Sequence, residues 1–383
     1  MNQPVSLDPQ EKRLFVDNLQ RFLKEEVAPH YNDWEKAGIW PRALWRRFGE
    51  QGFLCVDVPE AYGGYGVSFE LSCLVVDEVS KFGFGALASG LSVHSDIVAP
   101  YILNLGSEAQ KEKYLPGMVS GEIVGAIGMT EPSAGSDLQR IKTHAARDGD
   151  QFKVNGQKTF ITNGQHCDLI VLATKTDPSQ GAKGMTLFTV DCALTGFNRG
   201  RNLDKMGLHS GDTSELFFDD LIVTTADILG GEGQGFVNMM KELPRERLIL
   251  GVGCVGAAQG AFDLTVAYIT ERQAFGQAVS GFQNSRYKLA EMKTDIELCR
   301  AMAEKYTAQF IAGELTSAEA SMLKLAASEM QGRVADQCVQ LFGGYGYMTE
   351  YPISRAYLDA RIQRIYGGTS EIMKELISRS IVS

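Results

Sequence analysis

The chain has 383 residues, 44% of them apolar and 22% charged, which is enough for two or three globular domains that each bury a core. Its formal net charge of −10 argues against nucleic acid as a partner, because an acidic surface repels phosphates. The seven cysteines contain no Cys-x-x-Cys pair and the five histidines are scattered, which indicates reduced, buried thiols and no metal site.

The amino-terminal third is predicted to be helical. Asp8 is a suitable N-cap, Pro9 suits the first helical position, and Glu11 can complete a capping box. Apolar residues then recur at helical spacing over 15–27 and again over 71–79. No basic and apolar leader precedes this region, so we expect a cytoplasmic protein without a signal peptide.

The pattern changes to short β-prone runs after residue 150. Asn155-Gly156 lies between runs at 152–154 and 158–162, which predicts a tight hairpin at that dipeptide. Several further runs are separated by Gly, Asp, Pro and Asn, so we expect a β-barrel or sandwich rather than a parallel sheet. These runs are 169–173, 185–190, 216–218 and 221–223.

Helical periodicity returns after the glycine-rich segment 230–233. Apolar stripes over 289–310 and 322–341 are typical of helices that face a bundle core. The predicted fold class is therefore α+β and multidomain, with an N-terminal helical domain, a middle β-domain and a C-terminal four-helix bundle. The expected domain ranges are 1–126, 127–232 and 233–383.

An uncharged apolar run extends from Leu248 to Phe262. It is shorter than the ~20 residues that a membrane-spanning helix needs, so no membrane insertion is expected. Within it, residues 251–256 match G-x-G-x-x-G, the glycine pattern of dinucleotide-binding proteins. In those proteins an acidic residue about 20 positions later binds the ribose, and Glu271 lies near that position. A nicotinamide site would need a strand before these glycines. Because the flanks are helical, close helix packing is the favoured interpretation.

Glu246 lies directly before this run, and Pro244 interrupts or begins a helix beside it. Charged clusters usually face solvent, but the apolar run that follows suggests that this end points inward. A buried carboxylate has a raised pKa, which makes Glu246 a candidate general base.

Two polar segments, 129–137 and 160–164, are either capped loops or contacts for a flat polar ring. The glycine-rich segments 343–346 and 366–371 are expected to end helices or to allow close backbone approach.

Together these segments resemble the acyl-CoA dehydrogenase family over nearly the whole chain. The motifs that carry the resemblance are Thr130-Glu-Pro-x-Ala-Gly-Ser-Asp137, Asn155-Gly-x-Lys158, Ile161-Thr-Asn-Gly164, Arg272-x-x-Phe-Gly276, Gly343-Gly-x-Gly346 and Tyr366-x-Gly-Thr369. The resemblance implies a homotetramer, a dimer of dimers, with FAD bound between the β-domain, the bundle and a neighbouring subunit. It also implies an acyl-CoA substrate and an electron-transfer flavoprotein as acceptor.

The resemblance also assigns roles to individual residues. Ser136, Arg247 and Tyr366 would contact the substrate, and Arg247 would also support the base. Arg272 and Phe275 would reach the dinucleotide of a neighbouring subunit, where a planar guanidinium suits a diphosphate. The full set implied for the cofactor is Met129, Thr130, Ser136, Phe160, Thr162, Arg272, Phe275, Gln283, Gln340, Gly343, Gly344, Thr369 and Glu371.

The chain departs from one branch of the family at Gly367. Short- and medium-chain members carry their catalytic glutamate there, whereas long-chain and isovaleryl-type members place it in a helical Glu-Arg-Leu segment, which Glu246-Arg247-Leu248 matches. The resemblance therefore implies that Glu246 takes the α-proton while the β-hydride leaves for flavin N5. The Gly367 amide would bind the thioester oxygen, as a preorganised donor for a developing oxyanion.

The local pattern favours a long straight acyl chain. Branched, isovaleryl-type acyl groups and acyl groups on a carrier protein are the alternatives. A flavin monooxygenase or oxidase on the same fold and a catalytically silent acyl-CoA-binding protein are rival functions. The candidate base argues against the oxygen-using enzymes, and the complete set of flavin contacts argues against a silent protein.

Overall fold

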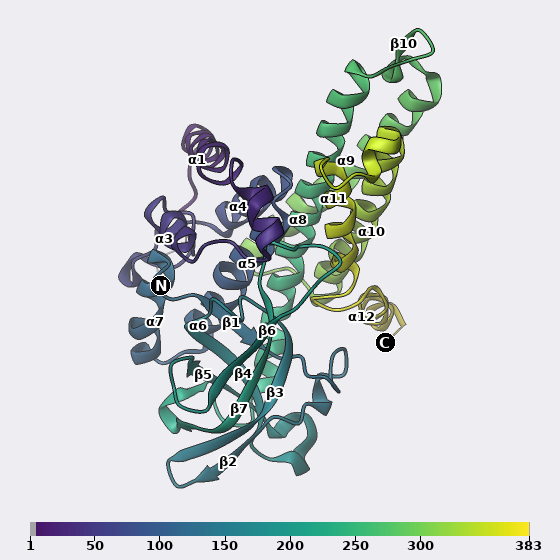
Figure 1. Cartoon of the computed structure of the whole chain (residues 1–383). Helices are drawn as coiled ribbons and strands as arrows, with labels where there is room; N and C mark the ends of the chain where they lie inside the picture. The colour runs from purple at the N-terminus through teal and green to yellow at the C-terminus, as the bar shows by residue number, and fades with distance from the viewer. Residues whose placement is uncertain (1–4, 383) are drawn as a thin grey trace.

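The computed structural model describes residues 5–382, which run from helices through a sheet to a second set of helices (Figure 1). The predicted start of the first helix is confirmed, because Asp8 accepts hydrogen bonds from the Gln10 and Glu11 amides and Glu11 accepts one from the Asp8 amide. The amino-terminal helices are α1 (Pro9–Phe22), α2 (Tyr31–Ala37), α3 (Ala43–Glu50), α4 (Phe69–Lys81), α5 (Gly85–Ser92), α6 (Ala99–Leu105) and α7 (Glu108–Ser120).

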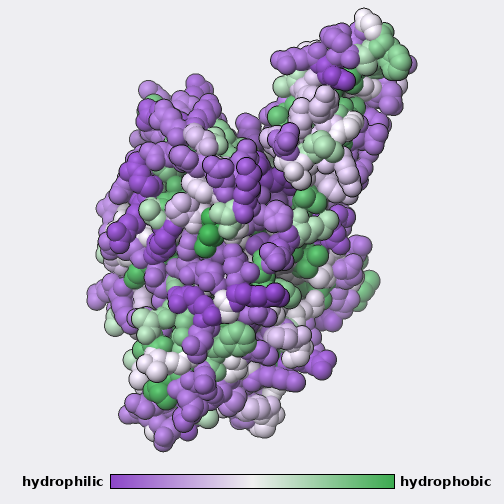
Figure 2. All heavy atoms as spheres, in the orientation of Figure 1, coloured by the Kyte–Doolittle hydropathy of each residue, from purple (hydrophilic) through white to green (hydrophobic). Residues whose placement is uncertain are grey.

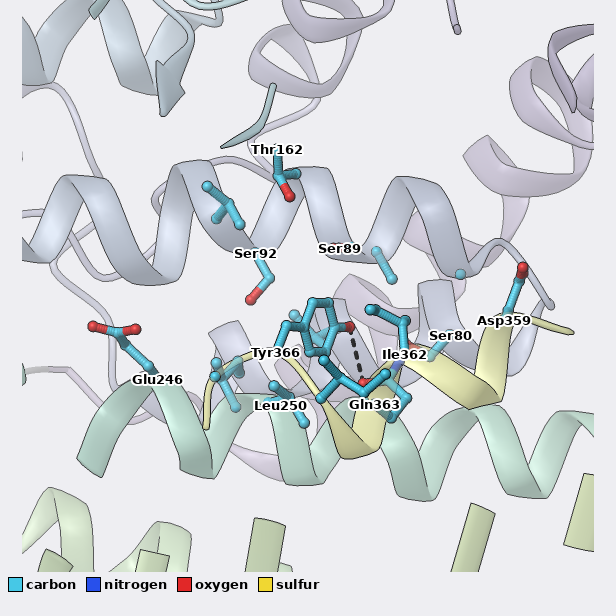
Figure 3. A pocket seen from close by; sticks show the side chains of 18 of the residues that line it. Ser80, Ser89, Ser92, Thr162, Glu246, Leu250, Asp359, Ile362, Gln363 and Tyr366 are labelled. Carbon is cyan, nitrogen blue, oxygen red and sulfur yellow. Dashed lines mark hydrogen bonds between the residues drawn. The ribbon is translucent and has the colours of Figure 1, made fainter. Parts of the chain in front are cut away.

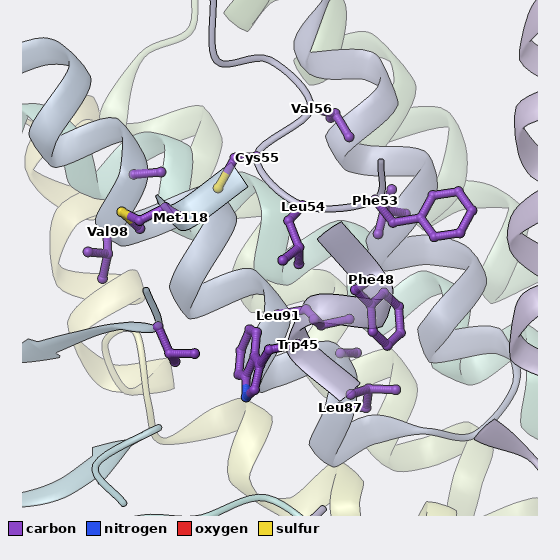
Figure 4. Close-up of a cluster of buried hydrophobic side chains, with 14 of the residues drawn as sticks. Trp45, Phe48, Phe53, Leu54, Cys55, Val56, Leu87, Leu91, Val98 and Met118 are labelled. Carbon is purple, nitrogen blue, oxygen red and sulfur yellow. The ribbon is translucent and has the colours of Figure 1, made fainter. Parts of the chain in front are cut away.

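Large side chains fill the core of the amino-terminal helices. Figure 4 shows Trp45 and Phe48 of α3 beside Phe53 and Leu54 of the following loop, with Leu91 of α5. All five are buried, and the same cluster includes alternate residues of one face of the sheet. The helical layer is thus fixed to the sheet by continuous apolar burial, which positions its helices for the site described below.

All eight strands of the middle region form one mixed, largely antiparallel sheet in the order β6-β7-β3-β2-β4-β5-β8, with β1 parallel to β4. Side chains of β3 and β7 meet those of β4 and β5 in a single cluster, so the sheet curves around its own core. The strands are β1 (Gly125–Gly128), β2 (His144–Asp148), β3 (Gln151–Thr162), β4 (Leu169–Lys175), β5 (Met185–Asp191), β6 (Phe197–Asn202), β7 (Thr213–Thr224) and β8 (Ile228–Leu229).

The hairpin predicted at Asn155-Gly156 is wrong. Strand β3 continues through this dipeptide with a shift of register against β7, and the chain turns before it, between β2 and β3. The local signal has another cause. Gly156 has φ +151°, and a Cβ there would lie 2.6 Å from the Thr143 Cα, so the bulge needs glycine. Asn155 hydrogen-bonds Asp220 across the sheet, at 2.9 Å from its side-chain nitrogen.

The carboxyl-terminal helices are α8 (Gly235–Glu271), α9 (Gln283–Ile311), α10 (Ser317–Phe342), α11 (Pro352–Ala360) and α12 (Ser370–Val382), and α10 packs against α8, α9 and α12. Helix α8 passes through Pro244 without ending.

The G-x-G-x-x-G sequence lies inside α8, which excludes a dinucleotide turn. A Cβ at Gly256 would lie 2.4 Å from the Asp77 carbonyl oxygen, so the glycine allows α8 to approach α4 closely, as predicted.

Two helical stretches, Gly85–Leu105 and Gly235–Glu271, have the length and hydropathy of a membrane span. Of their most apolar windows, 72% and 50% respectively are buried within the protein. Helices buried in the core of a domain can have the same length and hydropathy as a membrane span. Packing within the protein therefore accounts for the apolar residues of both stretches.

Candidate active site

A cavity of about 1410 Å³ lies where the amino-terminal helices, the end of β3, α8 and the segment before α12 meet. Figure 3 shows Glu246 near one end of the view and Asp359 at the other, with Tyr366 between them and Thr162 on the far side from α8. Tyr366 donates a hydrogen bond to Gln363 at 2.9 Å. The cavity is lined by ten of the residues named from the sequence: Met129, Thr130, Ser136, Phe160, Thr162, Glu246, Arg247, Tyr366, Gly367 and Thr369.

A buried ion pair holds the two polar segments together at the cavity wall. Lys158 of β3 donates to Glu131 at 2.8 Å and to the Met129 carbonyl at 3.1 Å, and its side chain is fully buried. The Thr159 amide also donates to the Thr130 carbonyl at 2.9 Å. The loop that follows β1 and the end of β3 therefore form one rigid wall, because breaking a buried pair leaves an uncompensated charge.

Phe160 interrupts the regular strand within this wall. It has φ +60°, lies at a register shift in β3, and leaves 67% of its surface exposed. A bulky residue rarely adopts left-handed backbone geometry, and strained residues are concentrated at functional sites. The exposed ring and the nearby hydroxyls of Thr130 and Thr162 present a mixed apolar and polar surface to the cavity.

Glu246 projects from α8 into the cavity and is 8% exposed. Burial raises the pKa of its carboxyl to about 7, which the Tyr101 hydrogen bond and the Arg247 charge partly offset and the negative Glu242 reinforces. Tyr101 donates to Glu246 Oε1 at 3.0 Å. A carboxylate with a pKa near neutral is well matched to general-base catalysis.

The segment before α12 brings a backbone loop close to α8. Gly367 has φ +62°, and a Cβ on it would lie 2.9 Å from the Leu250 side chain, one turn beyond Glu246. The buried Lys324 of α10 donates to the Gly368 carbonyl at 2.5 Å and ties this loop to the bundle. Burial lowers the pKa of Lys324 to about 8.

Arg247 follows Glu246 on α8 and is also buried. Its Nη1 lies 3.4 Å from the Ser317 hydroxyl, whereas its Nε has no hydrogen-bond partner among residues 5–382. A buried guanidinium with an unused donor at a cavity wall is available to a polar group of a ligand.

The remaining residues implied for the cofactor lie elsewhere. Arg272, Gln340, Gly343 and Gly344 line a second cavity of about 510 Å³ at the far part of the bundle, where the Arg272 guanidinium lies 5.5 Å from the Tyr345 ring centre. Phe275 is 97% exposed on the hairpin of β9 (Gln273–Ala274) and β10 (Gln277–Ala278). Gln283 and Glu371 are exposed and line neither cavity.

The sequence did not point to two residues that contact the site, Tyr101 and Lys324. Each has apolar residues on both sides of it in its helix, and each meets its partner through a contact distant in sequence. A buried lysine on a helix face is a weak signal that such a side chain has a specific partner.

Three family models match successive parts of the chain: acyl-CoA dehydrogenase N-terminal domain over residues 9–122, middle domain over 126–221 and C-terminal domain over 233–382. The chain belongs to the acyl-CoA dehydrogenase family. It is 46% identical to the pig mitochondrial long-chain specific acyl-CoA dehydrogenase, over 97% of this chain and 86% of that protein.

Solved structures agree with this assignment. An acyl-CoA dehydrogenase from Geobacillus kaustophilus aligns with a TM-score of 0.94 at 47% identity, over 98% of both chains. A chain solved in work on the electron-transferring flavoprotein of Acidaminococcus fermentans aligns with a TM-score of 0.95 at 37% identity, over 98% of this chain and 99% of that one.

Family membership makes this protein an FAD-dependent oxidoreductase that dehydrogenates fatty acyl-CoA. The chain's own residues fit the cofactor. The wall formed by Phe160, Thr130 and Thr162 offers an aromatic face and hydroxyl groups, as a flat polar ring system requires.

Proposed function

We propose that this enzyme oxidises long, straight-chain fatty acyl-CoA thioesters, with Glu246 as the base. The observation that carries the acyl-chain assignment is the set of α8 residues that line the cavity. Beyond Glu246 one face of this helix continues to line it with Leu250, Gly253, Ala257 and Gly260. Three of these four are glycine or alanine, so α8 itself places no bulky side chain over most of this length. Helix α4 closes over the far end, where a Cβ on Gly260 would lie 2.0 Å from the Lys81 carbonyl oxygen.

The length of this wall matches a long acyl chain. At ~1.5 Å per residue, the α8 axis rises about 21 Å from Glu246 to Gly260. Tetrahedral carbon chains with bonds of about 1.52 Å at about 111° advance about 1.25 Å per carbon. The wall therefore accommodates about 17 carbons in extended form. A short or branched acyl group would leave most of it unfilled.

In the proposed mechanism, the acyl α-carbon lies beside Glu246 and the thioester oxygen beside the Gly367 amide. Bound FAD supplies the acceptor for the hydride that leaves the β-carbon. The Gly367 amide stabilises the enolate oxygen as Glu246 removes the α-proton, and Lys324 keeps that amide in place through the Gly368 carbonyl. The apolar walls exclude water, which strengthens both interactions.

An anaerobic titration tests this proposal directly. The FAD-loaded enzyme is mixed with straight-chain acyl-CoAs of increasing length, with branched acyl-CoAs and with an acyl carrier-protein thioester, and flavin absorbance is followed. We expect bleaching by long straight-chain thioesters, with efficiency rising until the wall along α8 is filled. Preferential bleaching by branched or carrier-bound substrates would overturn the acyl-chain assignment, and the absence of bleaching by any thioester would overturn the proposed base chemistry.

We also propose a homotetramer in which two subunits share each FAD. Two observations support a shared site. The residues implied for the cofactor divide between two separate cavities of one chain. The hairpin that carries the exposed Phe275 projects at the tip of the bundle, where Figure 2 shows hydrophobic residues at the surface. A neighbouring subunit would cover this tip and complete the dinucleotide site.

Hybrid enzymes test the shared site. Arg272→Ala alone is expected to weaken FAD binding roughly 10- to 100-fold, since it removes charge-assisted hydrogen bonds to a diphosphate. Glu246→Gln alone should keep FAD but reduce it slowly. Co-expressed with different tags and purified as a hybrid, the two should recover flavin reduction, because each Arg272→Ala subunit keeps its base and receives Arg272 from its partner. A confirmed hybrid without recovery would show that each FAD is bound by one chain.

The electron acceptor in this proposal is an electron-transfer flavoprotein, supported by the similarity to the Acidaminococcus fermentans chain reported above. Reoxidation of substrate-reduced enzyme by a purified electron-transfer flavoprotein, compared with reoxidation by oxygen, measures this preference. The cytoplasmic location suggested by the sequence stays a prediction.

A further inference from the structure

Two hydrogen-bonded residue pairs connect α6 with the part of α8 that carries Glu246. Tyr101 and Asn104 lie one turn apart on α6, and Glu242 and Glu246 lie one turn apart on α8. Tyr101 donates to Glu246 Oε1 at 3.0 Å, and the Asn104 side-chain nitrogen lies 3.1 Å from both carboxylate oxygens of Glu242.

Tyr101 is held firmly before any ligand binds. It is 0% exposed, and Ala99 and Ile102 beside it on α6 are buried in the core of the amino-terminal helices. Burial, reinforced by the negative charges of Glu246 and Glu242, raises the pKa of the Tyr101 phenol far above its usual value. The hydroxyl therefore stays protonated and available as a donor over the whole working pH range.

We infer that Tyr101 is the positioning residue of the base: it occupies Glu246 Oε1 and leaves Oε2 free to take the α-proton. The inference rests on the proposed role of Glu246. Among residues 5–382, Tyr101 is the one hydrogen-bond donor to this carboxylate. A glutamate side chain has three rotatable bonds, and one fixed oxygen removes most of that freedom before the substrate arrives.

The hydrogen bond also affects the protonation of Glu246. Burial disfavours the carboxylate, whereas donation from Tyr101 favours it, and donation is the larger of the two effects that oppose burial. The charged neighbours on α8 are Arg247, which favours the carboxylate, and Glu242, which disfavours it. Arg245 faces away into an ion pair with Asp57 at 2.7 Å, and Tyr366 is the titratable group from the segment before α12 that lines the same cavity.

Tyr101→Phe removes only the hydroxyl and should leave FAD content unchanged. We expect the pH at which flavin reduction by a long-chain acyl-CoA is half-maximal to move upward by about one unit, because a lost hydrogen bond to a charged group corresponds to at least that shift. At neutral pH the reduction rate should fall roughly fivefold, because one unit above a pKa of about 7 lowers the ionised fraction of Glu246 from about a half to about a tenth. Tyr114→Phe is the matched control, since Tyr114 is a buried tyrosine of α7 whose oxygen contacts Lys113.

Glu242→Gln should move the pH midpoint of flavin reduction in the opposite direction. This second variant tests the inference even if Tyr101→Phe does not fold. Removal of the negative charge should lower the pH midpoint, since Glu242 disfavours the charged form of Glu246. The protonation of Glu246 can be read without turnover from the infrared carbonyl band of its protonated carboxyl, identified by its loss in Glu246→Gln. That band should titrate at higher pH in Tyr101→Phe and at lower pH in Glu242→Gln.

The outcomes separate this inference from the proposed function. If Glu246→Gln reduces its flavin slowly but Tyr101→Phe leaves both the pH midpoint and the infrared titration unmoved, the positioning role is overturned and the base assignment stands. If Glu246→Gln reduces its flavin at the normal rate, the base assignment itself is overturned.

Discussion

Replacement of Glu246 by glutamine is expected to slow flavin reduction by acyl-CoA by roughly 10²- to 10⁴-fold, the usual contribution of a positioned general base. Glutamine keeps the size of the side chain and can still lie beside Tyr101, but it cannot accept a proton at neutral pH. Stopped-flow absorbance under anaerobic conditions measures the effect. FAD content and the binding of a non-reacting acyl-CoA analogue should remain close to those of the unmodified enzyme.

Arg247→Lys provides a comparison at the adjacent position on α8. It keeps a positive charge near the carboxylate but removes the planar guanidinium, so substrate affinity should weaken while the reduction rate at saturation falls much less. This contrast distinguishes loss of the base from general damage to the cavity wall. A Glu246→Gln enzyme that reduces its flavin at the unmodified rate would contradict the mechanism.

Sequence patterns predicted the features that are determined locally. The capping box at Asp8 and Glu11 and the apolar stripes of α9 and α10 depend on residues a few positions apart, so periodicity was sufficient. The error at Asn155-Gly156 has the same origin. A dipeptide signal shows that the backbone needs glycine, but a turn and a bulge can both create that need, and only the neighbouring strand decides between them.

The candidate site depends largely on contacts between distant segments. Glu246 was identified because an uncharged run follows it, but its partner Tyr101 lies 145 positions earlier and Lys324 lies 44 positions before the carbonyl it binds. No repeating pattern of residues in the sequence indicates either of these contacts. Family resemblance supplied most of the candidate site residues, whereas their division between two cavities required the structure.

Ala257→Phe is expected to convert the enzyme to a preference for shorter chains. Ala257 lines the cavity on α8 about 16 Å along the helix from Glu246, which corresponds to about 13 extended carbons. A phenyl ring at this point should block the remaining wall. An acyl chain of about 16 carbons would then lose burial of three or four methylenes at about 0.8 kcal/mol each, or on the order of 10²-fold in kcat/KM.

Medium-length chains provide the internal control, since they end before Ala257 and their kcat/KM should change little. Ala267→Phe makes the same substitution at an exposed position of α8 and should leave the chain-length profile unaltered. If Ala257→Phe lowers kcat/KM equally for all lengths, the substitution has disturbed the fold or the base rather than the acyl site. If the long chains are unaffected, the acyl group does not follow α8, and the wall from Leu250 to Gly260 has another role.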